Sequence, residues 1–115
     1  MSTPSRISTD RDDVAGERDR RRFEALARRW KTETRRMATV REMIKHPAYE
    51  EIIGMGDAAV PMLLRELERD PDHWFAALRA ITATNPVPDE DRGDVGRMAE
   101  CWVRWGRENG YIWSG

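Results

Sequence analysis

Few side chains in this sequence of 115 residues have the type and spacing that catalysis or metal binding requires. The two histidines, His46 and His73, have no cysteine, aspartate or histidine at the spacing of metal ligands. We expect His46 to cap or pack a helix end and His73 to be a solvated or capping residue. The single cysteine, Cys101, cannot form an intrachain disulfide or a cysteine-based zinc site, and we expect a buried thiol.

Two further patterns resemble binding motifs but lack essential parts. Gly54-x-Gly56 has neither a preceding strand nor a following Lys-Ser/Thr pair, so it does not predict a phosphate loop. The acidic residues between Asp89 and Asp94 lack the spacing of a calcium loop and are typical of helix capping. The sequence therefore predicts no catalytic residues, no metal site and no cofactor, and we expect a protein that is not an enzyme.

Arginine is the residue type that could recognise a partner. Residues 1–36 contain 11 basic and 7 acidic side chains, whereas residues 37–73 contain 4 and 8, a contrast hidden by the net charge of −1. The segment 18–36 is either a solvated helix face with interspersed carboxylates or a contact surface for an acidic protein or for phosphates. Carboxylates such as Glu24 and Glu33 would repel phosphates and disfavour strong nucleic-acid binding.

Five tryptophans are many for so short a chain. Trp30, Trp74 and Trp102 lie on apolar helix faces, and we expect them in the core. Trp105 lies beside the apolar stripe of the last helix, and Trp113 follows it in a short tail with a tyrosine. These two tryptophans either fold back over the core or belong to an exposed binding patch.

Composition indicates one small domain. The chain is 36% charged and 39% hydrophobic, it begins without the apolar core of a signal peptide, and it has no apolar run long enough to span a bilayer. We expect a cytoplasmic protein without a membrane partner. Residues 1–16 are polar and should be disordered or ordered only on binding, and residues 17–115 should form a single domain.

Hydrophobic periodicity predicts helices throughout this domain and no sheet. Apolar residues every seven positions predict an amphipathic helix over 17–45, with a weak point at 31–34. Shorter helices are expected over 48–53, over 57–69 with Asp57 as N-cap and Pro61 in the first turn, and over 73–84. A final helix should run to about residue 109, with its N-cap among residues 89–94.

The residues M-G-D-A-A-V-P-M-L-L-R-E-L, the following D-P-D turn and W-F-A-A-L-R-A-I resemble a HEAT-like α-helical repeat. The resemblance covers roughly residues 47–86 and includes one clear repeat. It implies an all-α protein of about five helices, a minimal HEAT-like solenoid or orthogonal bundle. In such a fold the long N-terminal helix and the tryptophan-rich last helix would act as caps on one central helix pair.

A repeat of this kind holds partners and does no chemistry. We therefore expect a protein–protein interaction module, for example an adaptor, an inhibitor or antitoxin-like neutraliser, or a subunit of an assembly. The alternative is a nucleic-acid-binding accessory protein that uses the arginine-rich helix 18–36. The expected contact residues are Arg28, Arg29, Arg35, Arg36, Trp105 and Trp113.

Overall fold

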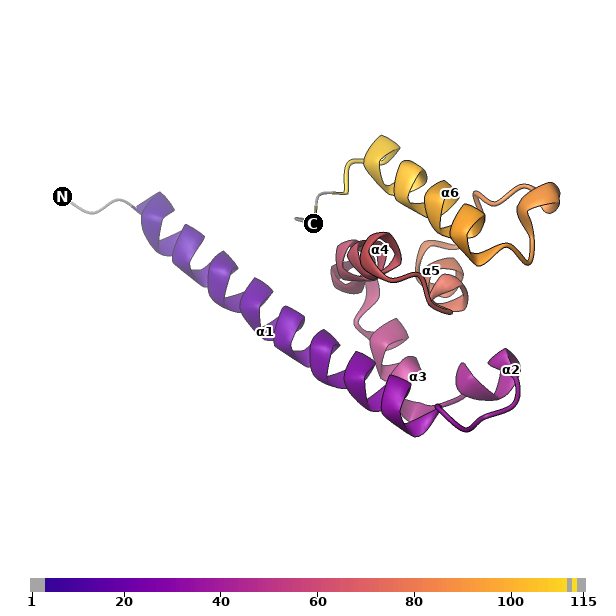
Figure 1. Ribbon diagram of the computed structural model, residues 1–115. Coiled ribbons are helices and arrows are strands. Elements are labelled where there is room, and N and C mark those ends of the chain that lie inside the picture. The colour runs from indigo at the N-terminus through magenta and orange to yellow at the C-terminus, as the bar shows by residue number, and fades with distance from the viewer. Residues whose placement is uncertain (1–3, 112, 114–115) are drawn as a thin grey trace.

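A computed structural model of the chain describes the backbone of residues 4–111 and 113, and the side chains from residue 16 onward within that range. Six α-helices follow one another along the chain (Figure 1): α1 (Pro4–Glu33), α2 (Val40–Met43), α3 (Pro47–Gly54), α4 (Val60–Arg69), α5 (Phe75–Thr82) and α6 (Val95–Glu108). Short 3-10 helices at Gly56–Ala59 and Asp89–Asp91 precede α4 and α6. These described residues contain no strand, which confirms the predicted all-α class.

The first helix differs from its predicted bounds at both ends. It begins at Pro4, and Figure 1 shows its N-terminal half running away from the other helices. Residues 1–3 lie outside the described residues, and the expectation that residues 1–16 are disordered or ordered only on binding stays a prediction. The predicted continuation to residue 45 is wrong, because α1 ends at Glu33. The Thr34 hydroxyl donates to the Trp30 carbonyl at 2.6 Å, so a β-branched residue closes the helix at the expected weak point.

His46 joins the end of α1 to the start of α3, as the predicted helix cap. Its Nδ1 accepts a hydrogen bond from the Ala48 N–H at 3.0 Å, with Pro47 in the first turn of α3. Because Nδ1 accepts, the ring proton lies on Nε2, which donates to Glu33 Oε1 at 2.8 Å. This hydrogen bond lowers the pKa of the Glu33 carboxyl below its usual value.

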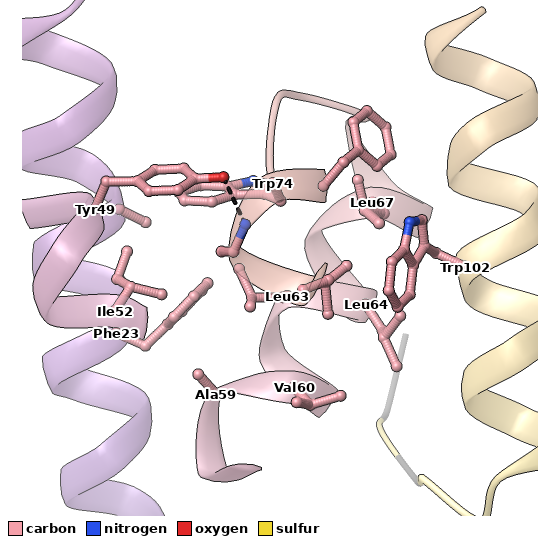
Figure 2. Close-up of a cluster of buried hydrophobic side chains, with 14 of the residues drawn as sticks. Phe23, Tyr49, Ile52, Ala59, Val60, Leu63, Leu64, Leu67, Trp74 and Trp102 are labelled. Carbon is pink, nitrogen blue, oxygen red and sulfur yellow. Dashed lines mark hydrogen bonds between the residues drawn. The ribbon is translucent and has the colours of Figure 1, made fainter. Parts of the chain in front are cut away.

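An aromatic cluster fills the space between α1, α3 and the start of α5. Phe23, Trp30, Tyr49 and Trp74 are buried, and the ring centroids of Trp30 and Trp74 lie 4.6 Å apart. The hydroxyl of Tyr49 donates to the His73 carbonyl and accepts from the Ala77 N–H, both at 2.9 Å. Figure 2 marks the bond that the hydroxyl accepts with a dashed line. Helix α5 has no N-cap side chain of its own, so a hydroxyl from α3 satisfies one of its free N–H groups.

The second half of the core lies between α4 and α6. Four buried side chains of α4 face it: Val60, Leu63, Leu64 and Leu67. Trp102 of α6 is fully buried opposite them (Figure 2). Trp30 and Trp74 are buried as well, so the prediction of these three tryptophans in the core is confirmed. Glycine at Gly106 favours the close approach of the two helices, because a Cβ there would lie 2.4 Å from Leu64 Cδ1 and this side chain would have to shift.

The helices pack mainly on the next but one in the chain. Helix α1 packs on α3, α3 packs on α5, and α4 packs on α6. Within the described part of the chain no helix is long and apolar enough to cross a membrane.

The starts of α4 and α5 differ from the sequence-based expectation. Asp57 was expected to cap a helix over 57–69, but a 3-10 turn precedes α4 and Asp57 instead accepts a hydrogen bond from the Tyr111 hydroxyl. Pro61 lies in the first turn of α4, as predicted. Helix α5 is shorter than the expected 73–84 and ends where Ala83 adopts a left-handed conformation with φ of 54°.

Candidate interaction surface

Two hollows lie side by side between α1 and α4. The first has a volume of about 370 Å³ and is lined by Gly16, Asp19, Arg20, Ala58, Pro61, Met62, Arg65 and Trp113. The second has a volume of about 410 Å³ and is lined by Phe23, Glu24, Ala27, Arg28, Lys31, Glu66 and Arg69. Both therefore have one wall on α1 and the other at the start of, or along, α4.

The lining residues follow one another at helical spacing along both walls. On α1 they recur every three or four positions from Gly16 to Lys31, and on the second wall they do so from Ala58 to Arg69. The two hollows therefore lie along one face of each helix, and we call them together the α1–α4 groove. Its α1 wall is about 22 Å long at 1.5 Å per residue, and residue numbers rise in the same direction along both walls.

The groove exists because α1 uses its apolar stripe to pack on α3 and not on α4. Phe23 and Ala27 are buried at the base of the α1 wall, while α4 directs its leucines toward the core and α6. An ion pair connects the walls near one end, where Lys31 Nζ lies 3.4 Å from Glu66 Oε1. Arg69 also approaches Glu66, with Nη1 3.6 Å from Oε2.

Basic side chains outnumber acidic ones along the groove. Its lining contains five basic residues, Arg20, Arg28, Lys31, Arg65 and Arg69, and three acidic ones, Asp19, Glu24 and Glu66. Arg20 is held by Glu17 on the same helix, with its Nη2 donating to both carboxylate oxygens at 2.6 and 2.7 Å. Arg28 has no ion-pair partner among the described side chains, and Arg65 Nε is buried without a hydrogen-bond acceptor there.

The C-terminal tail folds back and borders one end of the groove. The Trp113 indole N–H donates to Glu68 Oε1 of α4 at 3.0 Å, and the Arg107 guanidinium lies 5.4 Å from the centroid of the ring. The Tyr111 hydroxyl bonds to Asp57, and this bond raises the pKa of Tyr111. Of the two alternatives for the tail, the folded-back one is the observed one, and Trp113 stays partly exposed in it.

Two of the six expected contact residues line the α1–α4 groove. Arg28 lines one of its hollows and Trp113 lines the other. Arg29 is exposed and pairs with Glu33, with Nε 3.2 Å from Oε2.

The remaining three of the six lie elsewhere. Arg35 and Arg36 are exposed in the turn after α1 and do not line the groove. Trp105 is partly buried against Trp102 and Tyr111, at centroid distances of 5.4 and 5.6 Å.

Sequence reasoning missed the α4 wall and part of the α1 wall. The missed residues with a basic side chain, together with Met62 of the α4 wall, are Arg20, Lys31, Met62, Arg65 and Arg69. A signal is present in the sequence for three of them, since Lys31, Met62 and Arg65 each lie one position to the side of a core residue of their helix. The periodicity of one helix does not show which of its sides will face another helix.

The side chains with potential for chemistry have structural roles. Among the described residues, no three of the His, Cys, Asp and Glu side chains gather as a metal site would require. Asp94 caps α6 by accepting from the Arg97 N–H at 3.1 Å, as expected of the acidic segment. Cys101 is partly buried with its Sγ 3.6 Å from Asp91 Oδ2, and burial raises the pKa of its thiol.

In comparisons with known proteins, no protein-family model, no curated protein and no solved structure matches the chain. The function must therefore be inferred from the groove and its chemistry.

Proposed function

We propose that the protein is a non-catalytic protein–protein interaction module whose partner binds in the α1–α4 groove. The observation that carries this proposal is the groove itself, whose lining combines the partly exposed Trp113 with five basic side chains along two helices. Tryptophan and arginine are enriched in interface hot spots. The proposal includes the roles of adaptor, neutralising inhibitor and assembly subunit, which share this binding mode.

We further propose that α4 and α5 are a single HEAT-like repeat, with α1 and α6 as its caps. The residues that resemble the repeat support this, because Val60, Leu64 and Leu67 of α4 and Ala77 and Leu78 of α5 are all buried. A scaffold of this kind holds a surface in shape through its core and leaves the flanking helix faces free for a partner.

Nucleic-acid binding by the arginine-rich helix receives less support. Glu17 pairs with both Arg20 and Arg21, and Glu33 pairs with Arg29. These carboxylates neutralise arginines that would otherwise contact phosphates, and they would themselves be repelled by them.

Site-specific photo-crosslinking tests the proposed function. A photoreactive amino acid replaces Met62 in the groove and, as the matched control, the exposed Glu50 on α3. In an extract of the source cells, we expect one protein to crosslink at position 62 and not at position 50. Absence of any protein adduct at position 62 in a folded chain would overturn the proposal, and so would an adduct there that nuclease removes.

A further inference from the structure

We infer that a pocket between α2, α5 and the start of α6 binds a small molecule with an apolar body and a single carboxylate. This pocket, which we call the apolar pocket, shares no lining residue with the α1–α4 groove. The inference therefore goes beyond the proposed function and does not rest on it. It follows from the side chains that line the pocket, the charge of one wall, the volume, and the contacts that hold the walls.

The apolar pocket is lined mainly by apolar side chains that are still open to solvent. It lies on the side of the molecule away from the N-terminal end of α1 (Figure 1), and six of its nine lining residues are apolar: Val40, Ile44, Phe75, Ala76, Val95 and Met98. Of these six, only Phe75 is buried. Val40 is the only large hydrophobic side chain that is exposed among the described residues, with 40% of its surface accessible. A ligand in this pocket would therefore remove apolar surface from water.

The polar lining is confined to one wall. Helix α2 and its C-cap contribute two apolar side chains, and the first turn of α6 contributes another two. The wall formed by α5 and the residues just before it instead contributes His73, Ala76 and Arg79, which follow one another at spacings of three. A pocket with one basic wall and two apolar walls suits a ligand that is apolar except for one anionic group.

Arg79 is available to such an anion. No described residue of the lining is acidic, and Arg79 has no ion-pair partner among the described side chains. The positions three and four residues from Arg79 along α5 hold no carboxylate either. A carboxylate matches the planar guanidinium group, which can donate two hydrogen bonds to it.

The carboxylates near the lining in sequence do not neutralise Arg79. Asp91 and Asp94 each lie 3.6 Å from the guanidinium of Arg97. Asp72 accepts a hydrogen bond from the His73 N–H at 2.7 Å. The exposed carboxylates within two positions of the lining are not part of it: Glu42 and Glu100.

The volume of the apolar pocket selects a small ligand. It is about 280 Å³, just below the range of about 300–1,000 Å³ that is usual for drug-sized ligands. At about 30 Å³ for each water-sized group, this space holds about nine non-hydrogen atoms. A monocarboxylate whose apolar body has about six or seven carbon atoms would fill it.

Contacts with the aromatic cluster hold two of the walls in place. Trp30 Nε1 donates to the Met43 carbonyl at 2.7 Å and so attaches α2 to α1. The Tyr49 hydroxyl donates to the His73 carbonyl at 2.9 Å and holds the start of the basic wall. The apolar pocket therefore exists without a ligand, and little ordering of the protein would oppose binding.

Carboxylates and amines with the same apolar bodies test the inference on the full chain. The carboxylates are heptanoate and cyclohexanecarboxylate, and the amines are heptylammonium and cyclohexylmethylammonium. Binding is followed by NMR of the methionine methyl groups, because Met98 lines the apolar pocket whereas Met62 lines the α1–α4 groove. We expect at least one carboxylate to shift the Met98 signal and not the Met62 signal. It should bind about tenfold more tightly than the amine with the same body.

Matched variants locate the carboxylate. Arg79→Gln should weaken its binding by about three- to fivefold, whereas Arg104→Gln on α6, outside the pocket, should change it by less than about twofold. Val40→Asp adds a carboxylate to an apolar wall, so it should weaken the carboxylate ligand by about tenfold and strengthen the amine. All three positions are exposed, so circular dichroism and the urea midpoint should show the variants folded.

Several results would overturn the inference. One is the absence of a Met98 shift with both carboxylates at millimolar concentration in the folded chain. Others are equal binding of carboxylates and amines, and equal effects of Arg79→Gln and Arg104→Gln. A concentration-dependent dimer in sedimentation that Val40→Asp abolishes would assign the apolar pocket to a second copy of the chain. Crosslinking at position 62 tests the proposed function separately, so either proposal can fail without the other.

Discussion

Replacing Gly106 by alanine should destabilise the protein, although alanine is the better helix former. Gly106 lies inside α6 and is buried where this helix meets α4 and the tail. A Cβ on this residue would lie 2.4 Å from Leu64 Cδ1 and 3.3 Å from two atoms of the Trp113 ring. The first distance is well below van der Waals contact, so Leu64 or the helix itself must move.

Two opposing effects set the magnitude. Glycine to alanine in a helix interior gains about 0.5–1 kcal/mol from backbone entropy. Overpacking a filled core costs about 1–3 kcal/mol, and Leu64 has no exposed surface into which it could move. We therefore expect a net loss in the free energy of unfolding of about 1–2 kcal/mol, which lowers the melting temperature by about 4–8 °C for each kcal/mol in a domain of this size.

Gly96→Ala on the same helix is the matched control. Its added Cβ would have only Asp94 Oδ1 within 4 Å, at 3.6 Å, an ordinary contact. This variant should be neutral or more stable by up to about 1 kcal/mol. Urea unfolding followed by circular dichroism gives the free energy of both variants on one scale.

A double-mutant cycle separates the clash from other causes. Leu64→Ala alone should cost about 2–5 kcal/mol, because it leaves a cavity in the core. In the double variant with Gly106→Ala, the clash with Leu64 is absent, and the two losses should fall short of additivity by the full cost of that clash, about 1–3 kcal/mol. Strict additivity, or a Gly106→Ala protein as stable as the Gly96→Ala protein, would refute the steric reasoning.

Three further predictions concern hydrogen bonds and titration. Tyr49→Phe should lower the free energy of unfolding in urea by about 1–3 kcal/mol, because it leaves a buried N–H of α5 without a partner. Tyr111→Phe removes a more exposed hydrogen bond and should cost less than about 1 kcal/mol, so equal losses in the two variants would contradict the prediction. The alkylation of Cys101 should have its pH midpoint above the ordinary 9.0 in the folded chain and return to it in urea, because burial raises the pKa of the thiol. His46→Asn keeps a capping side chain but loses the bond to Glu33, so the pKa of Glu33 in an NMR titration should rise toward its ordinary 4.5. The bond stabilises the wild type above that pH and is lost on acidification, so this pH-dependent part of the stability should disappear in the variant. An unchanged Glu33 pKa would contradict the prediction.

Helix type and core membership could be predicted from periodicity, because they depend on spacing along one segment. Trp30, Trp74 and Trp102 were expected in the core for this reason and are buried there. The cap at His46 and the proline in the first turn of α4 follow from equally local rules. These features need no knowledge of which helix meets which.

The groove, in contrast, depends on which helices face each other. Met62 and Arg65 lie one turn apart on α4, and nothing in their spacing says that they will face α1. Asp57 fits the pattern of an N-cap, yet the hydroxyl of Tyr111, 54 positions away in the chain, engages its carboxylate instead. A tertiary partner overrode the local preference, and the same is true of α5, whose first turn is capped by Tyr49 of another helix.

The packing of each helix on the next but one has a consequence for synthesis of the chain. Most contacts join segments close in sequence, so folding should be fast, as in other helical proteins with low contact order. The two walls of the groove should nevertheless fold at different times during synthesis. The α1 wall can form once α3 has emerged from the ribosome, but α4 buries its leucines against α6, which follows it in the chain. The proposed recognition surface is therefore complete only after α6 has emerged as well, and a nascent chain that lacks α6 should not yet bind the proposed partner.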